Sequence, residues 1–291
     1  MNRSTLAFAY NISGFYDPAL AARFGAIAFD SDNARELWLS AIPNGSSRVV
    51  GLPSSEELLA EQCRRVKQAN PHTRCLVYRN AGLGLQWLSA EAQAMYGPDA
   101  GRLFLHAATR RGGKSGPGSA LYNSPSPITW PTGSVHSPLD QYFFNFSEPA
   151  TAALWNDTVL FGEHGLGSPD VDGFFVDDDA FGREHPTLPE RCGMDAAAVA
   201  DFADRQHAAL VRSFESVVAA GGMVWDAMRD PDGFEARAWG QKAPLNPNPV
   251  NCSAWMVDKC GRDFSDHTLL MTDASLLGDD QRQAVATLLI N

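Results

Sequence analysis

Three consecutive carboxylates follow a short apolar segment in the middle of the chain. Residues 173–176 are apolar or glycine, which is typical of a strand buried on both faces of a parallel sheet. The next three residues are Asp177, Asp178 and Asp179. Because α/β enzymes keep their active sites at the carboxyl ends of such strands, this cluster indicates either catalytic carboxylates or a solvated acidic turn before the next helix.

Polar side chains also follow most of the other predicted strands. If these strands are parallel, their carboxyl ends meet at one mouth, and side chains far apart in sequence share a pocket. We expect the substrate-binding residues there to be Asp30, Asp32, Tyr78, Asn80, Asn145, Asp178, Asp179, Trp225, Trp239 and Asp273. For any single position the alternative is that loops are polar because they contact water.

Paired carboxylates suit the cleavage of a glycosidic bond. One carboxyl group must stay protonated to donate to the leaving oxygen, while another stays ionised to attack the sugar or activate water. We predict Asp177 as the nucleophile or base. The candidates for the acid come from the sixth predicted strand, its loop and the seventh strand, and are Asp226, Glu235 and Asp273.

The elements that must position these groups alternate between strand and helix along the chain. The predicted strands cover 6–11, 26–29, 73–78, 141–146, 173–176, 222–225, 268–272 and 287–291. The predicted helices cover 54–67, with a capping box at its start, 149–161, a long helix that begins at Asp195 and ends at Gly221, and 279–286. This alternation favours an α/β fold, a (β/α)8 TIM barrel.

The barrel is predicted as a single domain over residues 1–291, with long loops near 107–140 and 228–266. The last strand reaches the end of the chain at Asn291, so we expect a truncation at the C-terminal end. A doubly wound sheet is less consistent with the sequence, because no Gly-x-Gly-x-x-Gly motif follows a strand. The segment 112–115 resembles part of a P-loop, but it lies within a Gly/Ser/Pro-rich stretch.

The net charge and hydropathy of the chain limit the kinds of molecule it is expected to bind. The formal net charge of -11 argues against nucleic acid or an anionic membrane as a partner, and no apolar run is long enough to cross a bilayer.

Glycosylation motifs and cysteines bear on the compartment. Asn-x-Ser/Thr sequons begin at Asn2, Asn11, Asn44, Asn145, Asn156 and Asn251. They favour a glycoprotein that is secreted or located in the secretory pathway, although no signal peptide is recognised in the given sequence. Of the five cysteines, Cys252 and Cys260 are close enough to staple one loop.

Several phrases between residues 70 and 230 resemble those of a known group of enzymes. They are Leu76-Val77-Tyr78-Arg79-Asn80, the stretch from Tyr142 to Pro149, a helix with Trp155, and Asp172-Gly173-Phe174-Phe175-Val176-Asp177-Asp178. This pattern is similar to the middle of glycoside-hydrolase-like barrels of the endo-α-1,4-polygalactosaminidase type and their uncharacterised relatives. The resemblance implies a TIM barrel, a carbohydrate substrate, and a catalytic carboxylate at Asp177 with Asp178 next to it.

Two other functions stay open at this point. A metal-assisted hydrolase would bind Ca²⁺ or Mg²⁺ through Asp177–Asp179, but adjacent side chains on an extended strand point to opposite faces. A barrel that binds carbohydrate without cleaving it is the other alternative. We expect no cofactor and no metal, and the sequence does not predict the oligomeric state.

Overall fold

The computed structural model describes residues 6–39, 54–105, 141–177, 188–226, 235–239 and 241–244. Backbone contacts divide the chain into two compact units, Met1–Val224 and Trp225–Asn291, and each is described by itself. The single barrel domain over residues 1–291 stays a prediction. The predicted strands 268–272 and 287–291, the helix 279–286 and nearly all of both long loops lie outside the described residues.

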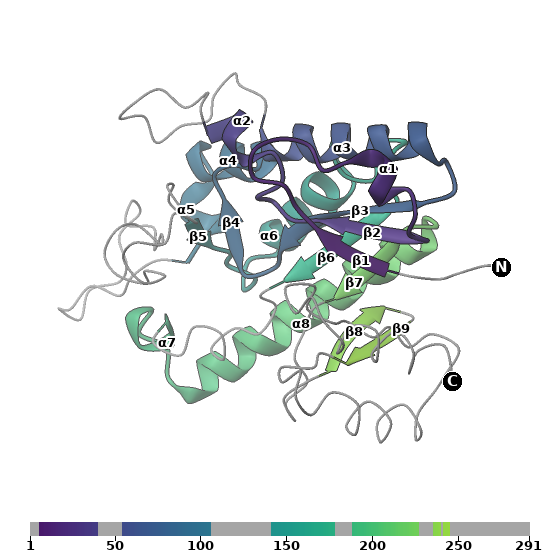
Figure 1. The fold of residues 1–291 in the computed structure, drawn as a ribbon. Helices are drawn as coiled ribbons and strands as arrows, with labels where there is room; N and C mark the ends of the chain where they lie inside the picture. Colours follow the sequence, from purple (N-terminus) through teal and green to yellow (C-terminus); the bar gives the residue numbers. More distant parts are fainter. Residues whose placement is uncertain are drawn as a thin grey trace, which may run out of the picture. The chain divides into compact units, whose positions relative to one another are not determined.

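A parallel sheet forms the centre of the first unit (Figure 1). Its strands are β1 (Leu6–Ala9), β2 (Ala26–Phe29), β3 (Arg74–Asn80), β6 (Gly173–Asp177) and the first two residues of β7 (Met223–Asp226), in that spatial order. The pairs β1–β2, β2–β3 and β3–β6 are parallel. The N–H of Met223 donates to the carbonyl of Asp172, so β6 and β7 start at the same end of the sheet. The predicted α/β class with a parallel sheet is confirmed, and no closed barrel is formed by the described strands.

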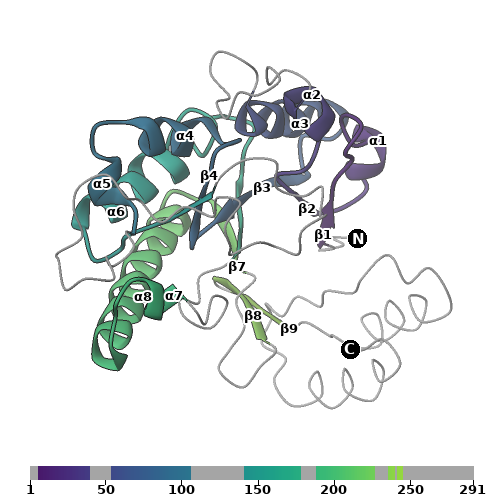
Figure 2. The same cartoon turned by 90° about the vertical axis from the view of Figure 1, so that its left-hand side faces the viewer.

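The helices of the first unit follow the strands along one side of the sheet (Figure 2). They are α1 (Pro18–Ala21), α2 (Arg35–Leu39), α3 (Ser55–Ala69), α4 (Ser89–Tyr96), α5 (Ala100–Leu103), α6 (Pro149–Ala153) with the π-helical turn η1 (Leu154–Leu160), α7 (Leu188–Arg191) and α8 (Ala196–Ala219). The order of the described strands does not reverse, unlike that of a doubly wound sheet. No helix in the described ranges is long and apolar enough to span a bilayer.

The two longest helices begin where the sequence predicts. Ser54 caps α3 through a complete capping box: its Oγ accepts from the N–H of Glu57, and the Glu57 carboxylate accepts from the N–H of Ser54. Asp195 caps α8 by accepting from the N–H of Ala198 at 2.8 Å. The chain leaves α8 through Gly221, whose φ of +83° lies in the left-handed region that glycine adopts without strain.

The prediction that 141–146 is a strand of the barrel is wrong. Within it, β5 (Gln141–Phe143) pairs antiparallel with β4 (Leu83–Leu85) in a separate two-stranded sheet. Gly84 allows this arrangement because a Cβ there would lie 2.8 Å from Cε1 of Phe104. The aromatic rings of Phe104 and Phe144 thus pack against a strand that the sequence analysis did not identify.

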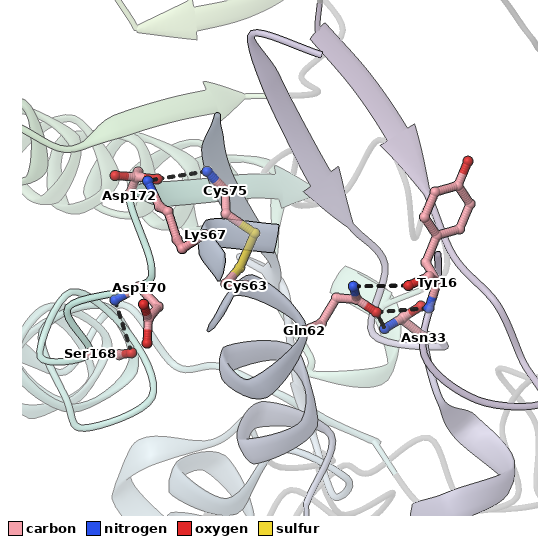
Figure 3. Close-up of a disulfide and its surroundings, with 9 residues drawn as sticks. All are labelled: Tyr16, Asn33, Gln62, Cys63, Lys67, Cys75, Ser168, Asp170 and Asp172. Atoms are coloured by element: carbon pink, nitrogen blue, oxygen red, sulfur yellow. Dashed lines mark hydrogen bonds and ion pairs between the residues drawn. A yellow bond between two sulfur atoms is a disulfide. The ribbon is translucent and has the colours of Figure 1, made fainter. Parts of the chain in front are cut away.

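A disulfide and an ion pair tie the elements together at the amino-terminal ends of the strands (Figure 3). Cys63 on α3 is bonded to Cys75 on β3, and both residues are fully buried. Asp172, directly before β6, accepts from the N–H of Cys75 at 2.7 Å and pairs with Lys67 of α3 at 2.5 Å. These contacts fix α3, β3 and β6 to one another. Cys252 and Cys260, the predicted staple, lie outside the described residues.

A buried ion pair lies between β3 and the helices that cover it. Arg79 is fully buried, and its guanidinium contacts the Glu56 carboxylate of α3 at 3.1 Å. The same guanidinium donates to the carbonyls of Tyr78, Val159 and His164. Because its donors have partners, the charge is tolerated on the helix side of the sheet.

Apart from Trp225 and Asp226, the described part of the second unit is a β-hairpin. It consists of β8 (Glu235–Trp239) and β9 (Gln241–Pro244), which pair antiparallel.

Candidate active site

The register of the sheet brings polar residues from three strands to one level. Phe29 pairs with Val77, so Asp30 follows β2 at the level of Tyr78. Asn80 pairs with Asp177 across β3 and β6. Since paired residues of parallel strands point to the same face, these side chains share the face opposite Arg79.

A chain of hydrogen bonds connects three of these residues. The side-chain amide of Asn80 donates to Oη of Tyr78 at 3.1 Å, and the Tyr78 hydroxyl contacts Oδ2 of Asp177 at 3.2 Å. The Tyr78 O–H is the donor in this contact, and the Asp177 carboxyl oxygen is the acceptor.

Asp30 lies in an environment that favours its protonated form. Burial raises the pKa of the Asp30 carboxyl group to about 6, and the N–H of Asp32, which donates to it at 2.8 Å, lowers that pKa only in part. The negative charges of Asp32 and Asp177 raise the pKa further. Asp30 and Asp177 are therefore close enough for the charge of one to affect the pKa of the other.

The loop that carries Asp30 is held by several hydrogen bonds. Asn33 is fully buried; its Oδ1 accepts from the N–H of Asn11, and its Nδ2 donates to Oε1 of Gln62 on α3. Ala34 has a φ of +58°, an unfavourable conformation for a residue with a Cβ, and its N–H donates to the carbonyl of Asn11 at 2.7 Å. The loop is fixed by these contacts despite the strain, which keeps Asp30 in one position.

The carboxylate of Asp32 contacts a cation. Its Oδ2 is 3.1 Å from Nη1 of Arg35, which is 7% exposed. Arg35 thus offsets a negative charge that would otherwise raise the pKa of Asp30 still more.

Aromatic rings lie on the same face of the sheet as the carboxylates. The ring of Phe175 lies 4.5 Å from that of Phe8 and 6.0 Å from that of Tyr78, measured between centroids. Tyr10, one residue beyond β1, is 52% exposed. Apolar walls of this kind lower the local dielectric and so strengthen the charge interactions of the acids.

The structure places other predicted site residues elsewhere or does not describe them. Asn145 donates through Nδ2 to the carbonyl of Arg102, and its N–H bonds the carbonyl of Leu103, so its contacts are with α5. Trp225 and Asp226 lie in β7, and Glu235 and Trp239 in β8, all within the second unit. Asp178, Asp179 and Asp273 lie outside the described residues. The roles of these seven residues in the second unit or outside the described residues stay predictions.

No group of three or more metal-binding side chains occurs among the residues that the structure describes. Asp178 and Asp179, which belong to the alternative metal site, are not among those residues.

Sequence reasoning assigned Asp30 to substrate binding and sought the second acid in later strands. The signal available for Asp30 was its place after β2, but its burial and the proximity of Asp177 depend on strand register. A single sequence does not supply that register.

Comparisons with known proteins found similarities in structure alone. No family model and no curated protein sequence matches the chain. Among solved structures, the GH36 α-galactosidase AgaA of Geobacillus stearothermophilus in complex with stachyose matches 77% of this chain at 10% identity and a TM-score of 0.39. An α-galactosidase from Lactobacillus brevis matches 76% at 11% identity and a TM-score of 0.36. This chain covers 27% and 26% of those two chains, about a quarter of their length.

A third structure matches over nearly its full length. It is the glycoside hydrolase domain of a PelA variant from Pseudomonas aeruginosa, with 93% of this chain and 95% of that chain covered, 14% identity and a TM-score of 0.35. These three structures are glycoside hydrolases or domains of them, and at these identities and TM-scores they do not assign this chain to a family.

Proposed function

We propose that this chain is a glycoside hydrolase in which Asp30 and Asp177 form the catalytic pair. The observation that carries the proposal is the contrast between two neighbouring carboxyl groups. Asp177 accepts a hydrogen bond from Tyr78, while burial favours the protonated form of Asp30. Glycosidic cleavage requires one protonated and one ionised carboxyl group at the same site.

Each carboxyl group then has one role. Asp30 donates its proton to the glycosidic oxygen as the bond to the anomeric carbon breaks, and Asp177 attacks that carbon or removes a proton from an attacking water. The sequence phrase that ends at Asp177 supports the choice of a glycoside as substrate. Asp226, Glu235 and Asp273 remain alternative acids, and their single Asn or Gln variants belong in the same assay.

The proposed architecture is the (β/α)8 barrel, with carbohydrate as the partner. Its support is the order of the described strands, which runs from β1 to β7 without reversal, and the position of the helices on one side. The acids then lie on the inner face at the carboxyl ends of the strands.

The test is a reducing-end assay on a panel of neutral and amino-sugar polysaccharides in α and β linkages. We expect Asp30→Asn and Asp177→Asn each to lower kcat/KM by about 10²- to 10⁴-fold. Asp204→Asn, which removes an exposed carboxylate on α8, is the matched control and should retain activity. The decrease in kcat/KM above about pH 6 should disappear in Asp30→Asn, because that limb reports the acid.

Two outcomes would reject the proposal. Cleavage that survives in both Asp30→Asn and Asp177→Asn would exclude this pair as the catalytic acids. Carbohydrate binding without cleavage by the wild type would favour the non-catalytic barrel.

A further experiment tests the role of Asp177. If Asp177 is a nucleophile, azide should restore turnover to Asp177→Ala and yield a glycosyl azide.

We also propose that the protein is made in the secretory pathway. The disulfide between Cys63 and Cys75 supports this, because such bonds are rare in reducing compartments, and the sequon at Asn11 is exposed. Treatment of the protein from its natural source with peptide N-glycosidase should reduce its mass, and an unchanged mass would count against glycosylation.

A further inference from the structure

We infer that Asn80 is a positioning residue that directs the hydroxyl proton of Tyr78 toward Asp177. The inference rests on the proposed function, because it concerns which of the two catalytic carboxyl groups keeps the proton. Asn80 itself touches Tyr78 rather than a reacting group.

The orientation of the Asn80 amide is fixed by a backbone turn. Asn80 is 3% exposed, and its Oδ1 accepts from the N–H groups of Gly82 at 2.9 Å and Leu83 at 2.7 Å. A flipped amide would place its NH₂ against these two donors, leaving all of them without an acceptor. The NH₂ group must therefore face Tyr78.

That orientation determines the direction of the next hydrogen bond. The Tyr78 oxygen accepts from Nδ2 of Asn80 at 3.1 Å, so the single hydroxyl proton remains available for Oδ2 of Asp177 at 3.2 Å. An acceptor in place of the Asn80 NH₂ would compete for this proton. The turn at residues 80–83 is thus connected to Asp177 through the Asn80 side chain and the Tyr78 hydroxyl.

The ring of Tyr78 is held independently of its hydroxyl. It is 9% exposed and stacks on Phe175 at an interplanar angle of 27°. Tyr78→Phe should keep this packing and remove only the donor to Asp177. Asn80→Asp should keep the acceptor for Gly82 and Leu83 while replacing the donor to Tyr78 with an acceptor.

The experiment compares these two variants with matched controls that lie outside the hydrogen-bond chain. Tyr16→Phe removes a hydroxyl from a ring that packs on Phe29, and Asn156→Asp adds a charge on η1. The carboxyl groups of ¹³C-labelled aspartate are titrated by NMR without substrate, with Asp177→Asn used to assign the signal. The pH profile of kcat/KM is then measured for each variant.

We expect the titration of Asp177 and the acid limb of kcat/KM to move to higher pH in Tyr78→Phe and Asn80→Asp. The loss of one hydrogen bond to a charged group should lower kcat about tenfold near pH 5 with little change in KM. Neither control should show this shift. An Asp177 titration that is unchanged in Asn80→Asp would overturn the inference.

The two hypotheses fail in different ways. If Asp177 titrates at higher pH in the variants but no glycoside is cleaved by the wild type, the positioning role holds and the hydrolase function does not. If glycosides are cleaved and both variants titrate like the wild type, only the role of Asn80 is rejected. Near-ultraviolet circular dichroism checks that each variant is folded. If Asn80→Asp does not fold, an unchanged Asp177 titration in Tyr78→Phe still overturns the inference, because the Tyr78 hydroxyl then has no effect on Asp177.

Discussion

Replacing Asp30 with asparagine should make the protein more stable at neutral pH, although it removes the proposed acid. Asparagine keeps a side-chain oxygen that can accept from the N–H of Asp32, the 2.8 Å contact that Asp30 makes. It cannot ionise, so the buried site no longer has to hold a negative charge beside Asp32 and Asp177.

The size of the expected gain in unfolding free energy follows from the pKa of Asp30. Folding raises it from 3.8 to about 6, and because each unit is worth about 1.4 kcal/mol, the ionised side chain costs at most about 3 kcal/mol. The folded state binds the proton more tightly than the unfolded state. The contribution of Asp30 to stability is therefore intact below about pH 4 and is lost as pH rises through about 6.

The assay is urea denaturation of wild type and Asp30→Asn at half-unit steps from pH 4 to pH 8. We expect the difference in unfolding free energy to be small at pH 4 and to approach about 3 kcal/mol in favour of the variant at pH 8. Asp204→Asn controls for the loss of one negative charge. A difference that is the same at every pH, or a wild type that is more stable at pH 8, would refute the reasoning.

Three further changes test contacts that hold the fold. Cys63→Ala with Cys75→Ala should cost about 3 kcal/mol of unfolding free energy, because the bond closes a loop with a sequence separation of 12; reduced wild type should match the double variant in urea denaturation. Arg79→Met should cost about 3–5 kcal/mol by leaving Glu56 buried without its cation, and adding Glu56→Gln should recover part of the loss in a double-mutant cycle. Gly84→Ala should cost about 1–3 kcal/mol in thermal unfolding, because its Cβ would lie 2.8 Å from a buried ring atom, and a neutral result would show that the ring can move.

The sequence was most informative where local signals agree with tertiary packing. The capping box at Ser54 and the cap at Asp195 define helix starts through hydrogen bonds between near neighbours. The strand before Asp177 is an unbroken apolar run because both of its faces are covered. These features depend on residues within one or two turns, so a single sequence contains them.

The elements that were missed depend on partners far away in sequence. β4 contains two leucines and a glycine, and it becomes a strand only because β5, more than fifty residues later, pairs with it. Distant partners also explain why the candidate site was predicted only in part. Asp30 and Tyr78 were identified from their strand ends, but the pKa of Asp30 depends on burial and on Asp177, which tertiary structure alone supplies.

The covalent bond between α3 and β3, together with the Lys67–Asp172 contact, lies at the end of the strands remote from the carboxyl groups. Substitutions in the loops beyond Asp30 and Asn80 can therefore accumulate without loosening the anchorage of the strands that carry them. Sequence change at the rim that carries the carboxyl groups is thereby separated from the contacts that anchor the strands.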